Sequence, residues 1–425
     1  MQGVIMDMKE EFGLVLEGGG AKGSYEIGAC KALEEMGVKI TAVTGTSVGA
    51  LNGAMVAQHE IDTAYQLWYN IHPSQVMNIE EEKLKKLTHL EIRPDDIRYY
   101  LKMLGEIIVE GGIDVTPLKK LIKKHVNEEK LRTSDIAFGM VTVSFTDRRA
   151  LEIFVEDIPY GQIADYLFAS ANFPLFRSAK IGDKIYLDGG IYDNLPIRML
   201  VNRGYKSLIT VRVGGLGRIR KVNLDNLEMI NIEAKESLGG PLDFDTQKAR
   251  KNLKLGYFDA YRVMKNLSGQ YYYINLEYNE DYFVDYFSHL SPEMVLKIGQ
   301  TLGFKENVPY RRLLFEKIIP KLIEILKLPE NCNYQDIALA LAEKIAQEIG
   351  VERFHIYAFS ELISCITKKY NKSKKIDVKK EHSLISHFGF LSLFSGDDLL
   401  KKLVQDLLDE NFIESLKDNQ NSIND

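Results

Sequence analysis

Two apolar runs, each followed by a glycine-containing loop and then by a helical pattern, constrain the fold of this chain most strongly. The first run, Phe12–Leu16, leads into the loop Gly18–Gly23, and the second, Ile40–Thr44, leads into the loop Gly45–Gly49. Small and apolar residues at helical spacing follow both loops. Because consecutive strand–helix units pack with right-handed crossovers, these two units predict neighbouring parallel strands. The chain is therefore expected to have an α/β fold.

Short apolar segments continue after these two units. A stretch rich in Lys, Glu, Leu and Ile between residues 80 and 126 predicts helices inserted before the sheet resumes. Four more segments are typical of strands: Ile136–Phe145, Ala150–Val155, Lys184–Leu187 and Ser207–Val213. We therefore expect the sheet to be complete by about residue 215.

The second half of the chain has a mainly helical pattern. It contains long amphipathic segments and a Lys-rich stretch, and it ends in a polar run. We predict four parts: a core over residues 10–215, a mixed α/β extension packed on it over 216–290, a helical C-terminal region over 291–416 with a Lys-rich linker at 368–380, and a disordered tail over 417–425.

Composition narrows the classes of partner and location. The net charge of −6 argues against nucleic acid as the main partner, because neutralising phosphates requires an excess of Lys and Arg on the binding face. Cys30, Cys332 and Cys365 lie far apart, without the paired spacing of a zinc site or a disulfide framework. The N-terminus lacks a secretory pattern and no apolar run is long enough to span a bilayer. A cytoplasmic location is therefore expected.

One aromatic segment keeps peripheral membrane contact open as an alternative. Phe388–Phe394 follows the Lys-rich stretch, so it could dock on an anionic membrane or cover an apolar channel. Burial against neighbouring helices is an equally good interpretation.

The strongest chemical signal is a serine at the turn between the second strand and its helix. Ser47 stands at the centre of a Gly-x-Ser-x-Gly segment, and a serine at the apex of so sharp a turn needs small neighbours. The start of the following helix favours negative charge that develops near the serine oxygen. Ser47 is therefore the candidate nucleophile. The residues of its elbow are Gly45, Thr46, Val48 and Gly49.

The earlier glycine loop has the spacing G-x-G-x-x-G, which several kinds of site share. A dinucleotide site needs an acidic residue at the end of the second strand, and a P-loop needs Lys-Ser or Lys-Thr after the last glycine; this chain has neither. Beside a nucleophile, the backbone N–H groups of such a loop can instead hold an oxyanion. Lys22 either attracts an anionic head group or is simply an exposed lysine. The candidate oxyanion-hole residues are Gly18, Gly19, Gly20, Ala21, Lys22 and Gly23.

A serine nucleophile needs a base, and the histidines of this chain are poorly placed to supply one. His289 is the best of the eight, because it follows an acidic residue in the order of an α/β-hydrolase triad. Asp188 is better placed, since it directly follows the strand Lys184–Leu187 at the edge where α/β sheets build their sites. Gly189 and Gly190 after it allow close approach of another backbone. A turn aspartate that bonds its own backbone is the simpler alternative.

Four ordered blocks together resemble the patatin-like phospholipase family. These are the glycine loop, the Gly-x-Ser-x-Gly segment, the segment Ala169–Phe176, and the segment Asp188–Pro196 with its Asp-Gly-Gly start. The resemblance covers about Phe12 to Val213. It implies a three-layer fold, with a mainly parallel central sheet flanked by helices, followed by a largely helical C-terminal region.

The resemblance also implies a mechanism and a substrate class. Ser47 would attack a fatty-acyl ester of a phospholipid or another lipid, Asp188 would accept its proton, and the N–H groups of Gly19, Gly20 and Ala21 would hold the oxyanion. No metal, cofactor or nucleotide is implied. Two alternatives stay open: a Ser–Asp–His esterase that uses His289, and a nucleotide-binding protein that uses the glycine loop.

Overall fold

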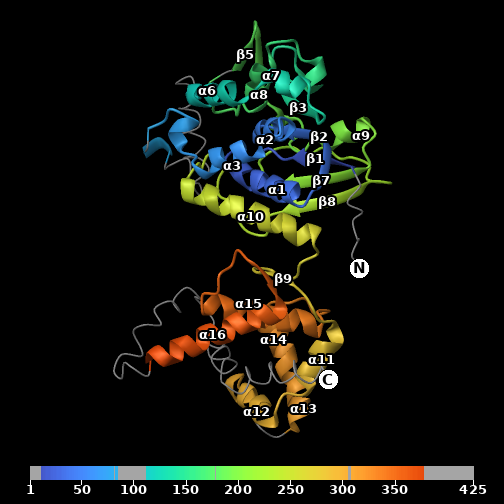
Figure 1. The fold of residues 1–425 in the computed structure, drawn as a ribbon, viewed down its shortest axis with the longest axis vertical. Helices are drawn as coiled ribbons and strands as arrows, with labels where there is room; N and C mark the ends of the chain where they lie inside the picture. The colour runs from blue at the N-terminus through green and yellow to red at the C-terminus, as the bar shows by residue number, and fades with distance from the viewer. Residues whose placement is uncertain (1–10, 81, 85–111, 178, 305–307, 378–425) are drawn as a thin grey trace. The chain divides into compact units, whose positions relative to one another are not determined.

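The computed structural model describes residues 11–80, 82–84, 112–177, 179–304 and 308–377. The chain divides into two compact units, residues 1–266 and residues 267–425 (Figure 1). This division lies inside the predicted extension 216–290. The aromatic segment Phe388–Phe394 and the predicted tail 417–425 lie outside the described residues.

The first two strand–helix units form as the glycine pattern predicts. Strand β1 (Glu11–Leu16) leads into helix α1 (Gly23–Glu35), and strand β2 (Lys39–Thr46) leads into helix α2 (Val48–Ala57). The two strands pair in parallel. Their carboxyl ends therefore lie at the same edge of the sheet, which brings the two glycine-containing loops together.

Eight strands of the described residues form one mixed sheet, in the order β5-β6-β3-β2-β1-β7-β8 with β4 also paired to β3. The run β3-β2-β1-β7-β8 is parallel, whereas β4, β5 and β6 join antiparallel at one side. The mainly parallel sheet is thus confirmed. The remaining strands are β3 (Ala137–Ser144), β4 (Arg149–Phe154), β5 (Ala179–Ile181), β6 (Lys184–Asp188), β7 (Ser207–Arg212) and β8 (Glu228–Glu233).

The sheet extends beyond residue 215, where the sequence analysis ended it. Strand β8 pairs with β7 at the edge of the sheet, with Ser207 opposite Glu228. Of its six residues only Ile232 is buried. An edge strand with so little apolar surface gives a weak sequence pattern, which is why the prediction was wrong here.

Helices cover both faces of the sheet, which gives three layers. Adjacent strand residues point to opposite faces, and in β2 Ala42 packs in one apolar cluster with Leu200 of α9 (Ile197–Asn202). Its neighbour Val43 faces the other way, toward Gly53 of α2. The other helices of this unit include α3 (Ile61–Tyr69), α6 (Thr116–His125), α7 (Glu128–Arg132), α8 (Ile163–Ser170) and the one-turn segments η1 (Gly20–Lys22), η2 (Pro73–Gln75), η4 (Val155–Asp157) and η5 (Gly189–Ile191).

Helix α1 is covered in turn by α10 (Thr246–Met264), which lies side by side with it (Figure 1). The two backbones touch at paired glycines. A Cβ atom on Gly28 would lie 2.0 Å from the carbonyl oxygen of Leu253, and one on Gly256 would lie 1.9 Å from that of Tyr25. Only glycine permits so close a crossing.

The second unit is largely helical, with one small sheet in which β9 and β10 pair in parallel. Its helices share one hydrophobic core. Helix α16 covers residues 368–377, the first part of the predicted linker, because Lys-rich sequence is compatible with helix. The elements are β9 (Tyr273–Asn275), α11 (Glu280–Ser288), α12 (Pro292–Thr301), α13 (Tyr310–Leu313), the π-helical turn η6 (Leu314–Ile318), α14 (Ile319–Ile325), α15 (Tyr334–Glu348), β10 (Ile356–Ala358) and α16 (Phe359–Asp377).

Across the part of the chain that the structure describes, every helix is too short or too polar to cross a membrane.

The glycine crossing of α1 and α10 predicts a large effect of a small substitution. Gly256→Val must push the two helices apart, and overpacking of this kind costs about 1–3 kcal/mol or more. We expect the variant to unfold at a lower temperature than the wild type in a thermal melt followed by circular dichroism. Gln247→Ala, at an exposed position of the same helix, should change the melting temperature little. Equal melting of all three proteins would contradict the close crossing.

Candidate active site

Ser47 occupies a strained turn between β2 and α2. Its backbone angles are φ 55° and ψ −123°, a combination that non-glycine residues rarely adopt. A Cβ atom on Gly45 would lie 2.2 Å from the carbonyl oxygen of Gly49, and a Cβ atom on Gly49 would lie 2.5 Å from that of Leu16. The turn can therefore close only with glycine at both flanking positions.

Two buried hydroxyl side chains hold this turn, one from α8 and one from within the elbow. Ser170, at the end of α8, accepts a hydrogen bond of 3.0 Å from the Ser47 N–H and donates one of 2.7 Å to the carbonyl of Val141. The Thr46 hydroxyl donates to the carbonyl of Asp193 at 2.7 Å. Ser170 lies inside the segment Ala169–Phe176 that resembles the family. The sequence alone indicates no role for it, because its hydrogen-bond partners lie far away along the chain.

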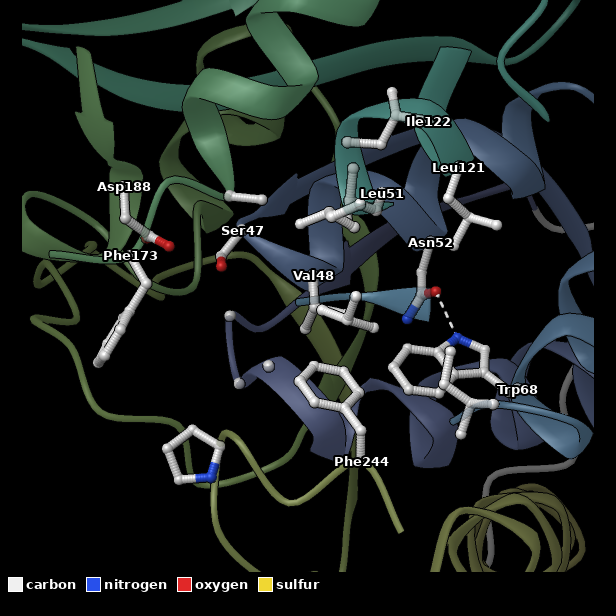
Figure 2. Close-up of a pocket in the computed structure, with 18 of the residues that line it drawn as sticks. Ser47, Val48, Leu51, Asn52, Trp68, Leu121, Ile122, Phe173, Asp188 and Phe244 are labelled. Atoms are coloured by element: carbon white, nitrogen blue, oxygen red, sulfur yellow. Dashed lines mark hydrogen bonds between the residues drawn. The ribbon is translucent and has the colours of Figure 1, made fainter. Parts of the chain in front are cut away.

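Asp188 ends β6 at the carboxyl edge of the sheet and is 6% exposed. Its Oδ1 accepts a 2.7 Å hydrogen bond from the Gly190 N–H. Burial raises the pKa of Asp188 to about 6, although hydrogen bonding with the Ser47 hydroxyl and the Gly190 N–H opposes this rise. Gly189 is needed beside it, since a Cβ atom there would lie 2.3 Å from the Val141 carbonyl oxygen. Figure 2 shows the Ser47 and Asp188 side chains at the same end of one cavity.

The glycine loop lies next to Ser47, and its N–H groups divide into bonded and unbonded ones. The Gly18 N–H donates to the Asn194 carbonyl at 3.0 Å, and the Ala21 N–H donates to the Pro241 carbonyl at 2.8 Å. Within the described residues, the N–H groups of Gly19 and Gly20 have no protein acceptor, and both glycines line the cavity. Ala21 is therefore not available as an oxyanion donor, contrary to the expectation from the resemblance.

Lys22 ties the glycine loop to the segment that follows β7. Its ammonium group donates to the carbonyl of Gly214 at 2.8 Å, and partial burial lowers its pKa, opposed by the charge of Glu17. The buried Glu17 carboxylate in turn accepts the N–H groups of Val213 and Gly214. Lys22 thus connects the glycine loop to the segment after β7, and the idea that it attracts a head group finds no support in these contacts.

Asn194 is the central polar residue of this region, although the sequence analysis assigned it no function. Its Nδ2 donates to the Gly18 carbonyl at 2.9 Å, and its N–H donates to the Arg218 carbonyl at 2.6 Å. A Cβ atom on Gly190 would lie 2.7 Å from its Oδ1. Asn194 therefore joins the glycine loop, the Asp188 segment and the segment after β7. Its place in the block that resembles the family was the only signal in the sequence.

One cavity connects these groups with an apolar interior. It contains about 1190 Å³ of empty space, open solvent at its mouth included. Helices α2, α3 and α6 supply much of its apolar wall, and Figure 2 shows their side chains extending away from Ser47. The apolar lining residues include Val48, Leu51, Met55, Leu67, Trp68, Leu118, Leu121, Ile122, Phe173 and Phe244.

A polar network limits this interior on one side. The Trp68 indole donates to Asn52 Oδ1 at 3.0 Å, and the Asn52 amide donates to the carbonyl of Gly23 and to Glu26 Oε2 (Figure 2). Burial raises the pKa of Glu26 well above its ordinary value. Trp68 also stacks on Phe244, with ring centroids 6.3 Å apart. The wall therefore presents mainly apolar atoms to the cavity, because Trp68, Asn52 and Glu26 bond to one another.

The histidines have different places in the structure. His289 follows α11 in the second unit, where its Nδ1 lies 2.8 Å from the carbonyl oxygen of Asp285. His125 ends α6 and lines the cavity. Burial lowers the pKa of His125, and its Nε2 has no hydrogen-bond partner among the described residues. Among the residues that the structure describes, no group of three or more His, Cys, Asp or Glu side chains is arranged to hold a metal ion.

Known proteins resemble this chain over about half of its length. The chain is 26% identical over 201 residues to patatin-like phospholipase domain-containing protein 6 of Mus musculus, covering 47% of this chain and 13% of that protein. It is 26% identical over 208 residues to a lysophospholipase of Kluyveromyces lactis, covering 48% and 13%. The matched part is thus a small fraction of these relatives.

Among solved structures, VipD from Legionella pneumophila aligns over 95% of this chain and 90% of that chain, with 15% identity and a TM-score of 0.40. The sequence pattern described as patatin-like phospholipase matches residues 14–201, which contain Ser47, Asp188 and the glycine loop. Through these residues, which make up less than half of the chain, the protein matches the patatin-like phospholipase family.

Proposed function

We propose that this protein is a lipid acyl hydrolase in which Ser47 is the nucleophile and Asp188 is the only general base. The observation that carries the proposal is the meeting of a strained serine turn and a buried carboxyl group at one end of an apolar cavity. A carboxylate is a weak base for a hydroxyl. Burial raises its pKa to about 6, which improves proton acceptance at neutral pH while the group stays mostly ionised.

The reaction proceeds in two halves. The Ser47 oxygen attacks the ester carbonyl while its proton moves to Asp188, and a tetrahedral intermediate forms. Its collapse releases the alcohol, which takes the proton from Asp188, and leaves a fatty acyl group on Ser47. Water then gives a proton to Asp188 and attacks the acyl group, which releases the fatty acid and restores the Ser47 hydroxyl.

We assign the oxyanion hole to the N–H groups of Gly19 and Gly20. Both line the cavity beside Ser47 and are without a protein acceptor in the described segments. The neighbouring donors of Gly18 and Ala21 hold the loop in place through Asn194 and Pro241. Donors fixed before reaction are worth more than donors that must reorganise, and each contributes about 2.7–4 kcal/mol to the transition state.

The substrate is best described as a fatty-acyl ester. The cavity wall beyond Ser47 is almost entirely apolar, so it suits a hydrocarbon chain and offers little to a charged or nucleotide ligand. The printed descriptions of the relatives, phospholipase and lysophospholipase, support a lipid substrate of this kind. Of the alternatives, a nucleotide site has less support, because the ammonium group of Lys22 in the glycine loop is bonded to the Gly214 carbonyl.

Paired substitutions test the roles of the two central residues. Ser47→Ala and Asp188→Asn should each lose nearly all hydrolysis of a fatty-acyl ester, because one removes the nucleophile and the other removes the proton acceptor. Loss of a general base alone costs roughly 10² to 10⁴ in rate. His289→Ala and His125→Ala should retain most activity. An active Asp188→Asn enzyme beside a folded but inactive His289→Ala enzyme would support the triad instead.

The raised pKa of Asp188 predicts two opposite pH effects. Turnover should be constant above pH about 6 and should fall about tenfold per unit below it, as the base becomes protonated. Stability should change the other way. Between the ordinary value of 3.8 and about 6 the unfolded chain releases the proton first, so the free energy of unfolding decreases as the pH rises.

Asp188→Asn removes this cost of burying a charge. At pH 7 the variant should unfold with a free energy higher by up to about 3 kcal/mol, measured by urea denaturation at several pH values. A wild-type stability that is independent of pH across this window would show that Asp188 is not perturbed by burial.

Ser170 is proposed as a positioning residue for the nucleophile. Ser170→Ala leaves the buried Ser47 N–H without its acceptor, a loss of about 1–3 kcal/mol. We expect kcat to fall about 10- to 100-fold with little change in KM, since the apolar binding wall is untouched. Ser144→Ala, at another buried serine, controls for loss of a hydroxyl. Equal kinetics of the two variants would remove Ser170 from this role.

A further inference from the structure

Exposed apolar side chains gather beside the open end of the cavity. The segment Gly214–Lys221 after β7, called here the mouth loop, presents Leu216 and Ile219 with exposed fractions of 73% and 41%. Ile191, three residues after Asp188, is 50% exposed. Leu216 also lines the cavity. Large apolar side chains grouped in this way on a surface indicate an interaction site.

The mouth loop is also basic. It contains Arg218, Arg220 and Lys221 and no acidic residue, although the whole chain carries a net charge of −6. Arg220 lies over the ring of Tyr192, at 4.4 Å. The side-chain charges of Arg218 and Lys221 have no partner among the described residues, and both residues are exposed. The loop therefore offers positive charge to something outside this chain.

The mouth loop is fixed against the catalytic segments. A Cβ atom on Gly215 would lie 1.6 Å from the Gly18 carbonyl oxygen, and the Arg218 N–H donates to the Gly190 carbonyl at 2.9 Å. The Gly214 N–H donates to the buried Glu17 carboxylate. A surface that binds this loop is consequently held next to the cavity opening, with no rearrangement of the site.

We propose that the mouth loop docks this protein on an anionic lipid surface. Exposed leucine and isoleucine side chains can enter the boundary between head groups and acyl chains, while unpaired cations bind anionic head groups. Separate apolar tips between cations fit a fluid surface better than a shaped protein partner. The biological purpose rests on the proposed function, because docking places ester bonds beside Ser47. The docking itself is measurable without catalysis.

Vesicle sedimentation of the full chain carrying Ser47→Ala tests the charge component. The protein should bind vesicles of phosphatidylcholine mixed with phosphatidylglycerol more tightly than vesicles of phosphatidylcholine alone, and added salt should weaken the binding. Lys221→Gln should reduce the affinity about fivefold, the effect of one basic residue near an anionic membrane. Lys206→Gln is the matched control, because Lys206 is exposed and precedes β7 at the amino end of that strand, whereas the cavity opens at the carboxyl end.

A second pair of variants tests the apolar component. Ile219→Ser should weaken vesicle binding, whereas Val263→Ser, at an exposed apolar position of α10, should not. With Ser47 intact, Ile219→Ser should hydrolyse a short soluble ester like the wild type and vesicle lipid more slowly. Unchanged vesicle binding of both Lys221→Gln and Ile219→Ser would overturn the proposal. The proposal would also be overturned if these variants lost self-association, measured by light scattering, and kept their lipid binding. Absence of hydrolysis with normal docking would instead count against the proposed function alone.

Discussion

The close approach of backbone to backbone at the carboxyl edge of the sheet is the constraint on which the rest of this site depends. At Gly18, Gly45, Gly189 and Gly215 there is no room for a Cβ atom, because a carbonyl oxygen or the Asn194 side chain occupies that space. The serine turn, the glycine loop and the Asp188 segment can therefore share one small volume. Asn194 satisfies the polar atoms that this crowding would otherwise leave unpaired.

The same crowding determines the electrostatics of the site. Asp188 stands where water has little access, so its negative charge is costly, and a serine hydroxyl and one backbone N–H are the groups that oppose the cost. A site of this kind gives up some folding stability in exchange for a base that is poised near neutral pH. The strained backbone of Ser47 also costs folding stability. Neighbours with no catalytic chemistry of their own, such as Ser170, hold its backbone angles.

Local signals in the sequence predicted local features well. The apolar runs and glycine loops predicted β1, β2 and their helices, because each unit is specified by adjacent residues. Contacts between distant residues were not predictable in this way. The carbonyl of Pro241 engages the Ala21 N–H, and that of Gly214 engages the Lys22 ammonium group. Likewise β8 escaped notice, since an edge strand needs few apolar residues. The resemblance to a family supplied the expectation of a Ser47–Asp188 dyad and of a lipid substrate, which no pattern of apolar residues could supply.

The cavity wall contains Trp68, the single tryptophan of the chain. Its indole N–H is bonded to Asn52 and its ring is stacked on Phe244, so its surroundings are well defined and apolar on the cavity side. All intrinsic tryptophan emission of this protein thus originates from the place where a hydrocarbon chain is expected to lie. The molecule has its own fluorescent reporter, and titration with fatty acids of increasing length would follow occupancy of the cavity without any added label.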